Sequence, residues 1–332
     1  MSSIATKEGK EPSKSNQTRM IMSCPSLSEL PAPPRGKKGW PWTEQSSQLL
    51  GNMPGGGLWP KISIVTPSYN QAHFIEKAIR SILLQGYPNL EYIIMDGGSS
   101  DKSVEIIKKY DKWITYWISE PDKGQSYAIN NGFKKASGKI FNWLNSDDYL
   151  MPNALSKVAT AYQASPTAGA WCGGSRWVDI NNNVQAIWWP NKLKSEQIAK
   201  WLQNHFAQSA CFFSEEAWQK CGPLDENLYY AMDFDLWLKI SKVFPIEKIN
   251  EVLSSDHIHS EAKTQRSMAQ MCAEVFLIQI RHGYEHLAIE QISQLIYEHV
   301  ALMKRLGQIS RFPLLRLFTP IVRIAWKKFL QI

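Results

Sequence analysis

Residues 61–70 read KISIVTPSYN, in which the short β-branched run Ile62–Val65 stops at Pro67. This run has the length and composition of a buried strand. The apolar residues that follow it are spaced so that they lie on one face of a helix: Ile75, Ala78, Ile79, Ile82 and Leu83. A strand followed at once by an amphipathic helix is the repeating unit of α/β folds, so we expect an α/β domain to begin near residue 58.

The same alternation continues along the chain. We predict strands at 92–95, 114–118 and 140–144, and helices at 101–110 and 125–136 between them. Short apolar strands that alternate with helices favour a mostly parallel, doubly wound sheet. Ligands of such sheets bind beyond the carboxyl ends of the strands, and the polar clusters of this chain fall at those ends.

Beyond residue 150 the pattern is less regular. The runs 171–180 and 184–189 flank three consecutive asparagines and predict a β-hairpin. The remaining expected elements are helices near 195–203 and 233–243, strands near 210–213 and 246–253, and helical structure from about 261 onward.

These patterns divide the chain into three parts. Residues 1–57 are rich in Ser, Pro, Lys and Gly, and their apolar surface is too small to offset the entropy lost on ordering. We therefore expect a disordered or loosely packed N-terminal tail, with Trp40 and Trp42 as side chains able to dock. Residues 58–260 form the α/β domain, and residues 261–332 form a helical C-terminal extension.

Composition sets broad limits on the class of protein. The 332 residues carry a formal net charge of +7, which suits nucleic acid, anionic lipid or a phosphorylated ligand and does not choose among them. We find no run of about 18 uncharged apolar residues and no apolar core of a secretory signal, so we expect a cytoplasmic protein without a membrane span. The five cysteines are scattered and show no CxxC pair, which argues against a disulfide framework.

Asp147 and Asp148 follow the strand predicted at 140–144. Adjacent carboxylates repel one another, and a buried pair usually has a cation to neutralise it. Mg²⁺ and Mn²⁺ prefer carboxylate oxygens and share their coordination shells with substrate phosphates. The alternative is a solvated turn in which Asp148 caps the helix that follows.

Three further strand ends carry polar or glycine-rich segments, namely TPSYN at 66–70, DGGSSD at 96–101 and EPDKGQ at 120–125. Small residues let a ligand approach the backbone, and the neighbouring side chains are able to bond a base or a ribose. None of these segments is a GxGxxG or a GxxxxGK[ST] motif, so a dinucleotide fold and a P-loop are disfavoured.

The ordered set TPSYN, DGGSSD, DKGQSYAINNG, LNSDD and YAMDFDLWLK resembles glycosyltransferase family 2, whose members have the GT-A fold. The resemblance covers residues 61–259 and implies a nucleotide-binding half at 58–150 and an acceptor half at 151–260. It further implies transfer of a sugar from a nucleotide-sugar donor to a glycan or a lipid-linked glycan.

The resemblance also assigns the donor site. Residues around the base, ribose and donor sugar would be Thr66, Pro67, Tyr69, Asp96, Lys123, Gln125 and Asn130. Many family members carry a second acidic residue after the position of Asp96, where this chain has Gly97. The expectation of a uridine diphosphate donor therefore rests only on the donors that are common in the family.

The resemblance implies a metal site and a base. Asp148 would bind Mn²⁺ or Mg²⁺ directly, and Asp147 would contact ribose or the metal through water. His259 would complete the metal shell, with His257 as the weaker match. Asp233 would be the catalytic base of an inverting transfer, and Asp235 a surface or supporting carboxylate; alternatively, Asp233 only caps its helix.

The final segment, 311–332, is basic, apolar and free of acidic residues. Such a stretch lies at a membrane interface or packs back on the domain, and the sequence leaves both alternatives open. The first would place the protein on the cytoplasmic face of a membrane.

Two rival functions differ in class from a glycosyltransferase. A sugar nucleotidyltransferase usually has a basic glycine-rich loop after its first strand, which 66–70 lacks. A non-catalytic nucleotide- or sugar-binding module would not need both Asp148 and Asp233. Nucleic acid is not an expected partner, because the excess positive charge lies in the two tails.

Overall fold

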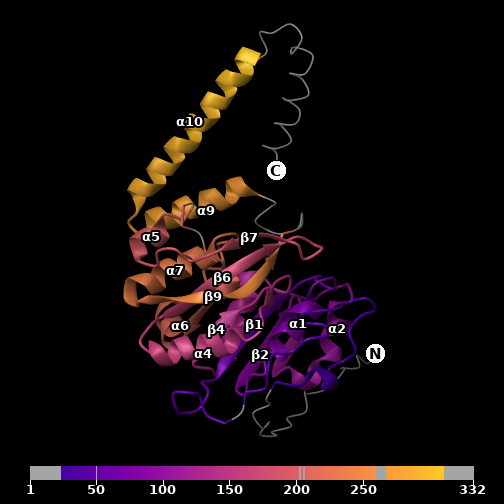
Figure 1. Cartoon of the computed structure of the whole chain (residues 1–332). Helices are drawn as coiled ribbons and strands as arrows, with labels where there is room; N and C mark the ends of the chain where they lie inside the picture. The colour runs from indigo at the N-terminus through magenta and orange to yellow at the C-terminus, as the bar shows by residue number, and fades with distance from the viewer. Residues whose placement is uncertain (1–23, 50, 202, 205, 259–266, 310–332) are drawn as a thin grey trace, which may run out of the picture.

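The structure is a computed structural model that describes residues 24–49, 51–201, 203–204, 206–258 and 267–309. Within these residues the chain forms a nine-stranded sheet of order β3-β2-β1-β4-β8-β6-β9-β5, with β7 paired to β6 (Figure 1). The strands are β1 Ile62–Ser68, β2 Leu90–Asp96, β3 Tyr116–Ser119, β4 Ile140–Trp143, β5 Tyr149–Leu150, β6 Ala170–Val178, β7 Val184–Trp188, β8 Cys211–Ser214 and β9 Ile246–His257.

Strands β1 to β4 are parallel to one another, as predicted from their alternation with helices. Strand β8 is antiparallel to both β4 and β6, and β9 is parallel to β6. The sheet is therefore mixed, and β9 ends at the same edge as β4. This topology brings the residues after β4 and those at the end of β9 to one edge of the sheet.

Helices cover both faces of the sheet, and the last described helix extends away from it (Figure 1). They are α1 Ile75–Leu83, α2 Ser103–Lys109, α3 Gln125–Phe133, α4 Ala154–Ala164, α5 Ser195–Ala199, α6 Glu215–Cys221, α7 Met232–Val243, α9 Met268–Arg281 and α10 Glu285–Ile309, with 3₁₀ turns η1 Leu27–Glu29, η2 Asp111–Trp113 and η3 Gln208–Ala210. Successive residues of a strand face opposite sides, so Ile64 joins a core with α1, α2 and α4, and Val65 a core with α3, α6, α7 and α9.

Part of the segment expected to be a loose tail is packed onto the domain. Cys24, Leu30 and Trp42 are buried in it. The buried guanidinium of Arg80 in α1 donates to the carbonyl oxygens of Pro31, Pro41 and Trp42 at 2.8–3.0 Å. The composition of this segment did not predict its packing, because the segment is held through backbone carbonyls that accept hydrogen bonds from the buried Arg80. Residues 1–23 lie outside the described residues.

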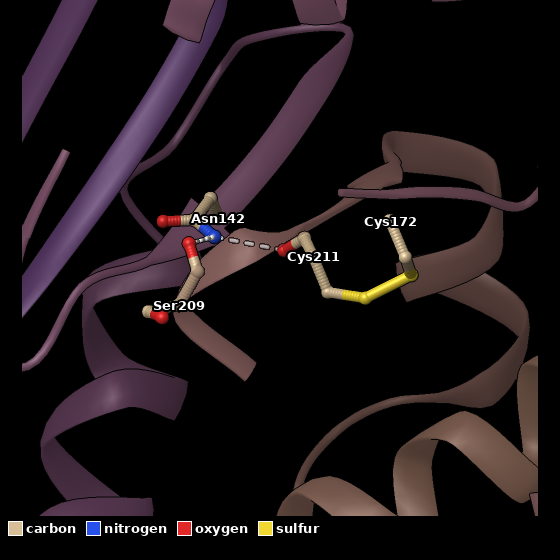
Figure 2. Close-up of a disulfide and its surroundings, with 4 residues drawn as sticks. All are labelled: Asn142, Cys172, Ser209 and Cys211. Carbon is tan, nitrogen blue, oxygen red and sulfur yellow. Dashed lines mark hydrogen bonds between the residues drawn. A yellow bond between two sulfur atoms is a disulfide. The ribbon is translucent and has the colours of Figure 1, made fainter. Parts of the chain in front are cut away.

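The structure corrects the expectation that cysteine pairing plays no part. Cys172 of β6 and Cys211 of β8 lie directly opposite each other in the antiparallel pair and form a disulfide with a Cα–Cα distance of 4.3 Å (Figure 2). The side-chain amide of Asn142 in β4 donates to the carbonyl oxygen of Cys211 at 2.8 Å. The two cysteines are 39 residues apart, so only the strand pairing reveals that they meet.

The helices after residue 266 begin as part of the domain and end away from it. Val275 and Ile278 of α9 are fully buried in the core that also contains α7. Helix α10 extends outward from the body of the molecule (Figure 1). Among the described residues, no helix has the length and apolar character needed to cross a membrane. The basic segment predicted at 311–332 lies outside the described residues.

Candidate active site

The carboxylates predicted to bind a metal lie at the edge where β4 and β9 end. Asp148 is buried, and its burial raises the pKa of its carboxyl well above the usual range; the charges of Asp256 and Asp147 raise it further. A carboxylate oxygen of Asp148 accepts a hydrogen bond from the Asn145 amide at 3.1 Å. The Gln125 amide in turn donates to Asn145 at 2.7 Å, which connects the first residue of α3 to this site.

Asp256 is a third carboxylate at this edge that sequence reasoning missed. It lies near the end of β9, and burial raises the pKa of its carboxyl to about 6, with Asp147 adding to the shift. The hydroxyl of Ser209 donates to one of its oxygens. Asp256 lies within β9, whereas Asp147 follows β4, and only the pairing of β9 with β5 and β6 shows that the two carboxylates lie near each other.

His257 and Lys77 support the loop that carries Asp147. The Nδ1 atom of His257 lies 2.5 Å from the carbonyl oxygen of Asp147, and its Nε2 atom lies 3.3 Å from Nζ of Lys77. Lys77 of α1 lies over the ring of Tyr149 at 3.5 Å, and burial lowers the pKa of its amine to about 7. His257 therefore holds the backbone beside the carboxylates.

The donor atoms at this edge fit a divalent cation. Asp148 is buried and Asp256 is half-buried, the charge of Asp256 raises the pKa of the Asp148 carboxyl, and both side chains present the oxygen ligands that Mg²⁺ and Mn²⁺ prefer. Across the ranges that the structure describes, no three His, Cys, Asp or Glu side chains are already grouped to hold a metal ion. His259, the other predicted ligand, falls outside those ranges.

The residues predicted to bind the nucleoside differ in the solvent exposure of their side chains. Tyr69 is 63% exposed, which leaves its ring free to stack on a base. Pro67 and Thr66 are buried, and the Thr66 hydroxyl accepts from the Tyr92 hydroxyl at 3.2 Å. The side chain of Thr66 is thus part of the core, and only its backbone borders the strand end.

Asp96 is buried at the end of β2 and organises the loop that follows it. Its carboxylate accepts from the backbone N–H and the hydroxyl of Ser99, at 2.8 and 2.6 Å, and from the Ser119 hydroxyl at 2.7 Å. It also lines a cavity of about 280 Å³. The other residues that line this cavity are Met95, Tyr116, Ile118, Glu120, Asp122, Tyr127, Ala128, Asn131, Lys134 and Lys135.

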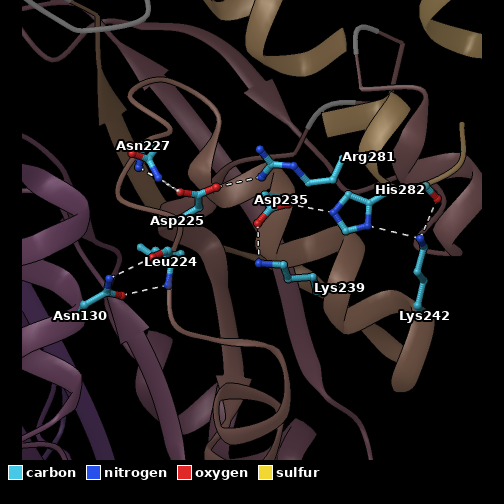
Figure 3. A network of polar contacts seen from close by, with 9 residues as sticks. All are labelled: Asn130, Leu224, Asp225, Asn227, Asp235, Lys239, Lys242, Arg281 and His282. Carbon is cyan, nitrogen blue, oxygen red and sulfur yellow. Dashed lines mark hydrogen bonds and ion pairs between the residues drawn. The ribbon is translucent and has the colours of Figure 1, made fainter. Parts of the chain in front are cut away.

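Lys123 and Asn130, both predicted to lie near the ribose or the donor sugar, differ from each other in their surroundings. Lys123 is exposed, with its amine 5.5 Å from the centre of the Tyr127 ring. Asn130 is buried, and its side-chain amide pairs with the backbone N–H and carbonyl of Leu224 at 2.9 and 3.0 Å (Figure 3). Its polar atoms hold the loop before α7, a structural task that its position in the motif did not reveal.

Asp233 is the second residue of α7, and its carboxylate accepts from the backbone N–H of Phe234 at 2.8 Å. One turn later, Trp237 stacks on Trp143, the last residue of β4, with ring centroids 5.8 Å apart. Because Asp147 and Asp148 follow β4 by a few residues, this contact brings the start of α7 toward the same edge of the sheet.

Asp235 is buried, so of the two expected alternatives, a surface or a supporting carboxylate, the first does not hold. It forms ion pairs with Lys239 at 2.6 Å and with His282 at 2.8 Å (Figure 3). Burial alone would raise the pKa of its carboxyl, but the bonds from His282 and Lys239 hold it below the usual value. Asp235 therefore joins α7 to the end of α9.

Similarity to known proteins identifies the family of the chain. Residues 63–217 match the family described as glycosyl transferase family 2. The chain is 30% identical over 218 residues to an uncharacterised glycosyltransferase of Rickettsia prowazekii, and the alignment covers 64% of this chain and 68% of that relative. The chain belongs to glycosyltransferase family 2. As a member of this family it is a nucleotide-sugar-dependent glycosyltransferase.

Other relatives of this glycosyltransferase are longer or more distant. Over 206 residues it is 27% identical to chondroitin synthase of Escherichia coli, which covers 61% of this chain and 29% of that enzyme. Among solved structures, Staphylococcus aureus TarS superposes with a TM-score of 0.52 at 18% identity, over 66% of this chain and 39% of TarS.

A second solved structure, the mannosyltransferase PcManGT from Pyrobaculum calidifontis, superposes with a TM-score of 0.51 at 17% identity, over 79% of this chain and 83% of that one. At these identities the two superpositions show the fold, which is the predicted GT-A-like arrangement.

Proposed function

We propose that this glycosyltransferase transfers a sugar from a uridine diphosphate donor to a glycan or a lipid-linked glycan, with inversion at the anomeric carbon. The observation that carries the proposal is the group of buried and half-buried carboxylates at the edge where β4 and β9 end, next to the strand ends that would hold the nucleoside. TarS has been solved with UDP and with UDP-GlcNAc, which supports this donor class by likeness of fold.

The base and ribose of the donor would lie beside Tyr69 and Asp96. Tyr69 offers an exposed ring for stacking, and Asp96 borders the cavity of about 280 Å³ at the end of β2. Asp147 would contact the ribose. Gln125, held near Asp148 through Asn145, would face the diphosphate side of the donor.

Asp148 would hold a divalent cation with Asp147 beside it, and His259 stays the predicted further ligand. PcManGT has been solved with GDP-Man and Mn²⁺, which supports a metal-dependent site in this fold. When bound, such a cation stabilises the negative charge that develops on the leaving diphosphate. The residues around it keep the carboxylates oriented, through the bond from Asn145 to Asp148 and the contact of His257 with the Asp147 carbonyl.

Asp233 would act as the catalytic base. Its place in the first turn of α7 puts a carboxylate at a helix N-terminus, where the helix dipole favours the ionised form that a base needs. It would take the proton of the acceptor hydroxyl while that hydroxyl attacks the anomeric carbon from the face opposite the diphosphate. One base and one in-line displacement give inversion.

Titration of UDP, GDP and TDP, each with and without Mn²⁺, tests the donor. Of the three nucleotides, we expect only UDP to bind, and we expect its binding to require the metal. Metal-dependent binding of GDP instead would replace the donor class and leave the transferase mechanism in place. Folded protein that binds none of the three would favour a non-catalytic module.

The variant Asp233→Asn tests the base. We expect UDP to bind as in the wild type, while UDP release from UDP-GlcNAc falls by about 100-fold or more, the usual contribution of general base catalysis. Glu247→Gln is the control, because Glu247 is an exposed acid at the start of β9, at the opposite end of that strand from the candidate site. A folded Asp233→Asn variant with undiminished turnover would place the base elsewhere.

The acceptor setting is a further part of the proposal. Helix α10 exposes apolar side chains, and the segment 311–332 is basic and apolar. We infer that this end of the chain contacts the cytoplasmic face of a membrane, which would bring a lipid-linked acceptor to the site.

A further inference from the structure

The carboxylate of Glu274 is bound to the chain just ahead of the proposed base. Glu274 lies in the middle of α9, and its two oxygens accept the backbone N–H groups of Tyr229, Tyr230 and Ala231 at 2.8, 2.7 and 2.9 Å. Ala231 is the N-cap residue of α7, and Asp233 follows it by two positions. One side chain from the C-terminal helices thus fixes the backbone from which Asp233 projects.

The start of α7 needs such a partner. The first N–H groups of a helix have no acceptor within the helix, and Ser, Thr, Asp or Asn normally supplies one at the N-cap. Here the N-cap is alanine, which offers no side-chain acceptor. Asp233 itself accepts from the N–H of Phe234 in the first turn. The carboxylate of Glu274 accepts from the N-cap residue Ala231 and from the two residues before it, where its negative charge also interacts favourably with the helix dipole.

The loop before α7 is fixed at its other end as well. Asn130 of α3 pairs with the backbone of Leu224, and Arg281 of α9 forms an ion pair with Asp225 at 2.8 Å (Figure 3). Residues 224–231 are therefore held between α3 on one side and α9 on the other. The same α3 reaches the carboxylate site through Gln125 and Asn145.

Helix α9 lies outside residues 63–217, the part of the chain that matches the family. Its attachment to the domain is firm, since Val275 and Ile278 are fully buried and His282 pairs with the buried Asp235. A helix that carries a side chain to the start of α7 has a role beyond covering the core.

We propose that Glu274 is a positioning residue for Asp233, so that the C-terminal extension completes the active site. This inference rests on the proposed function, in which Asp233 is the base. Displacing a catalytic group by about 1 Å costs on the order of 100-fold in rate. Loss of the Glu274 carboxylate leaves three N–H groups without their acceptor and frees the backbone before Asp233 to move.

The test uses the full chain with Mn²⁺ and UDP-GlcNAc, and measures UDP release with water as the acceptor. We expect Glu274→Gln and Glu274→Ala to lower kcat by about 10- to 100-fold, while the dissociation constant for UDP changes by less than about twofold. The split is expected because the nucleoside side of the site is built from β1 and β2, whereas Glu274 binds the backbone just before α7. Glu290→Gln, an exposed acid of α10, is the matched control and should leave kcat unchanged.

A double variant separates positioning from general stability. In the Asp233→Asn background, adding Glu274→Gln should lower kcat no further, because the group that Glu274 positions is already gone. Multiplicative losses in the double variant would overturn the proposal, as would an unchanged kcat in folded Glu274→Ala. Equal losses in kcat, UDP affinity and thermal stability would reduce Glu274 to a structural residue.

The proposed function fails in a different way. If Asp233→Asn turns over as fast as the wild type, the base is misassigned whatever Glu274 does. If Asp233→Asn is inactive and the Glu274 variants are fully active, the base stands and the positioning proposal falls.

Discussion

Three carboxylates define the candidate site at the scale of single residues. Burial is the largest cause of the raised pKa values of Asp148 and Asp256, and repulsion among Asp147, Asp148 and Asp256 raises them further. A raised carboxyl pKa means that the folded protein binds protons more tightly than the unfolded chain. This contribution to stability is present at low pH and is lost as the pH rises through the folded pKa, which for Asp256 is about 6.

We predict that Asp256→Asn stabilises the metal-free protein at pH 8 by about 1–3 kcal/mol, because it removes one of the repelling charges while an oxygen remains to accept from Ser209. The same variant should gain less stability from Mn²⁺ than the wild type does. For the wild type, the gain from Mn²⁺ should be larger at pH 8 than at pH 5.5, where protons compete with the metal. Thermal unfolding with and without Mn²⁺ at both values of pH measures these effects.

Glu247→Gln is the control for this prediction, because Glu247 is an exposed acid at the opposite end of the same strand. Its unfolding curve should not change. Destabilisation by Asp256→Asn in the absence of metal would contradict the idea that repulsion dominates at this site.

The sequence predicted the residues whose roles depend on their local motif. Asp147 and Asp148 were recognisable because they follow an apolar strand directly, and the structure places them at the strand edge as expected. Asp256 and Glu274 were not recognisable, because their partners come from strand pairing and helix packing far along the chain. The contact of the Asn130 amide with the loop before α7 was likewise not recognisable from the motif.

At the scale of elements, the disulfide between β6 and β8 adds a covalent bond to the middle of the sheet. Cys172 and Cys211 are both fully buried, and β8 connects the parallel half of the sheet to the half containing β6 and β9. The β-α alternation predicted the first four strands, but the order of the later strands depends on long-range pairing. For the same reason, the sequence did not predict that these two cysteines form a disulfide.

We predict that replacing both Cys172 and Cys211 by alanine lowers the free energy of unfolding by about 3–4 kcal/mol, as expected for a loop closed across 39 residues. Urea unfolding measures the change. Cys221→Ala is the control for loss of a buried sulfur, because Cys221 is buried and unbridged. Thiol titration of the denatured protein without reductant should find the three free cysteines; five thiols would contradict the bridge.

At the scale of the whole molecule, one segment before and one segment after the part that matches the family pack on the domain. Residues 24–49 are fixed on α1 by Arg80, and α9 is fixed on α7 through Asp235 and Glu274. Helix α10 then leaves this body (Figure 1). Its exposed apolar side chains are Ile289, Ile292, Leu295, Ile296, Tyr297, Val300 and Met303.

We predict that the full chain sediments with vesicles containing anionic phosphatidylglycerol and that a chain truncated after Gly307 does so much less. The removed segment carries Arg316, Arg323, Lys327 and Lys328 among apolar residues, and each cation near an anionic surface contributes about 1 kcal/mol. Replacing these four cations by glutamate in the full chain keeps the apolar residues and should abolish binding. Salt at about 0.5 M should weaken binding, because it shortens the Debye length and screens the attraction between the cations and the anionic lipid. If the truncated and full chains sediment equally with the vesicles, α10 or the domain binds the membrane. If neither chain sediments with the vesicles, the basic segment packs within the protein.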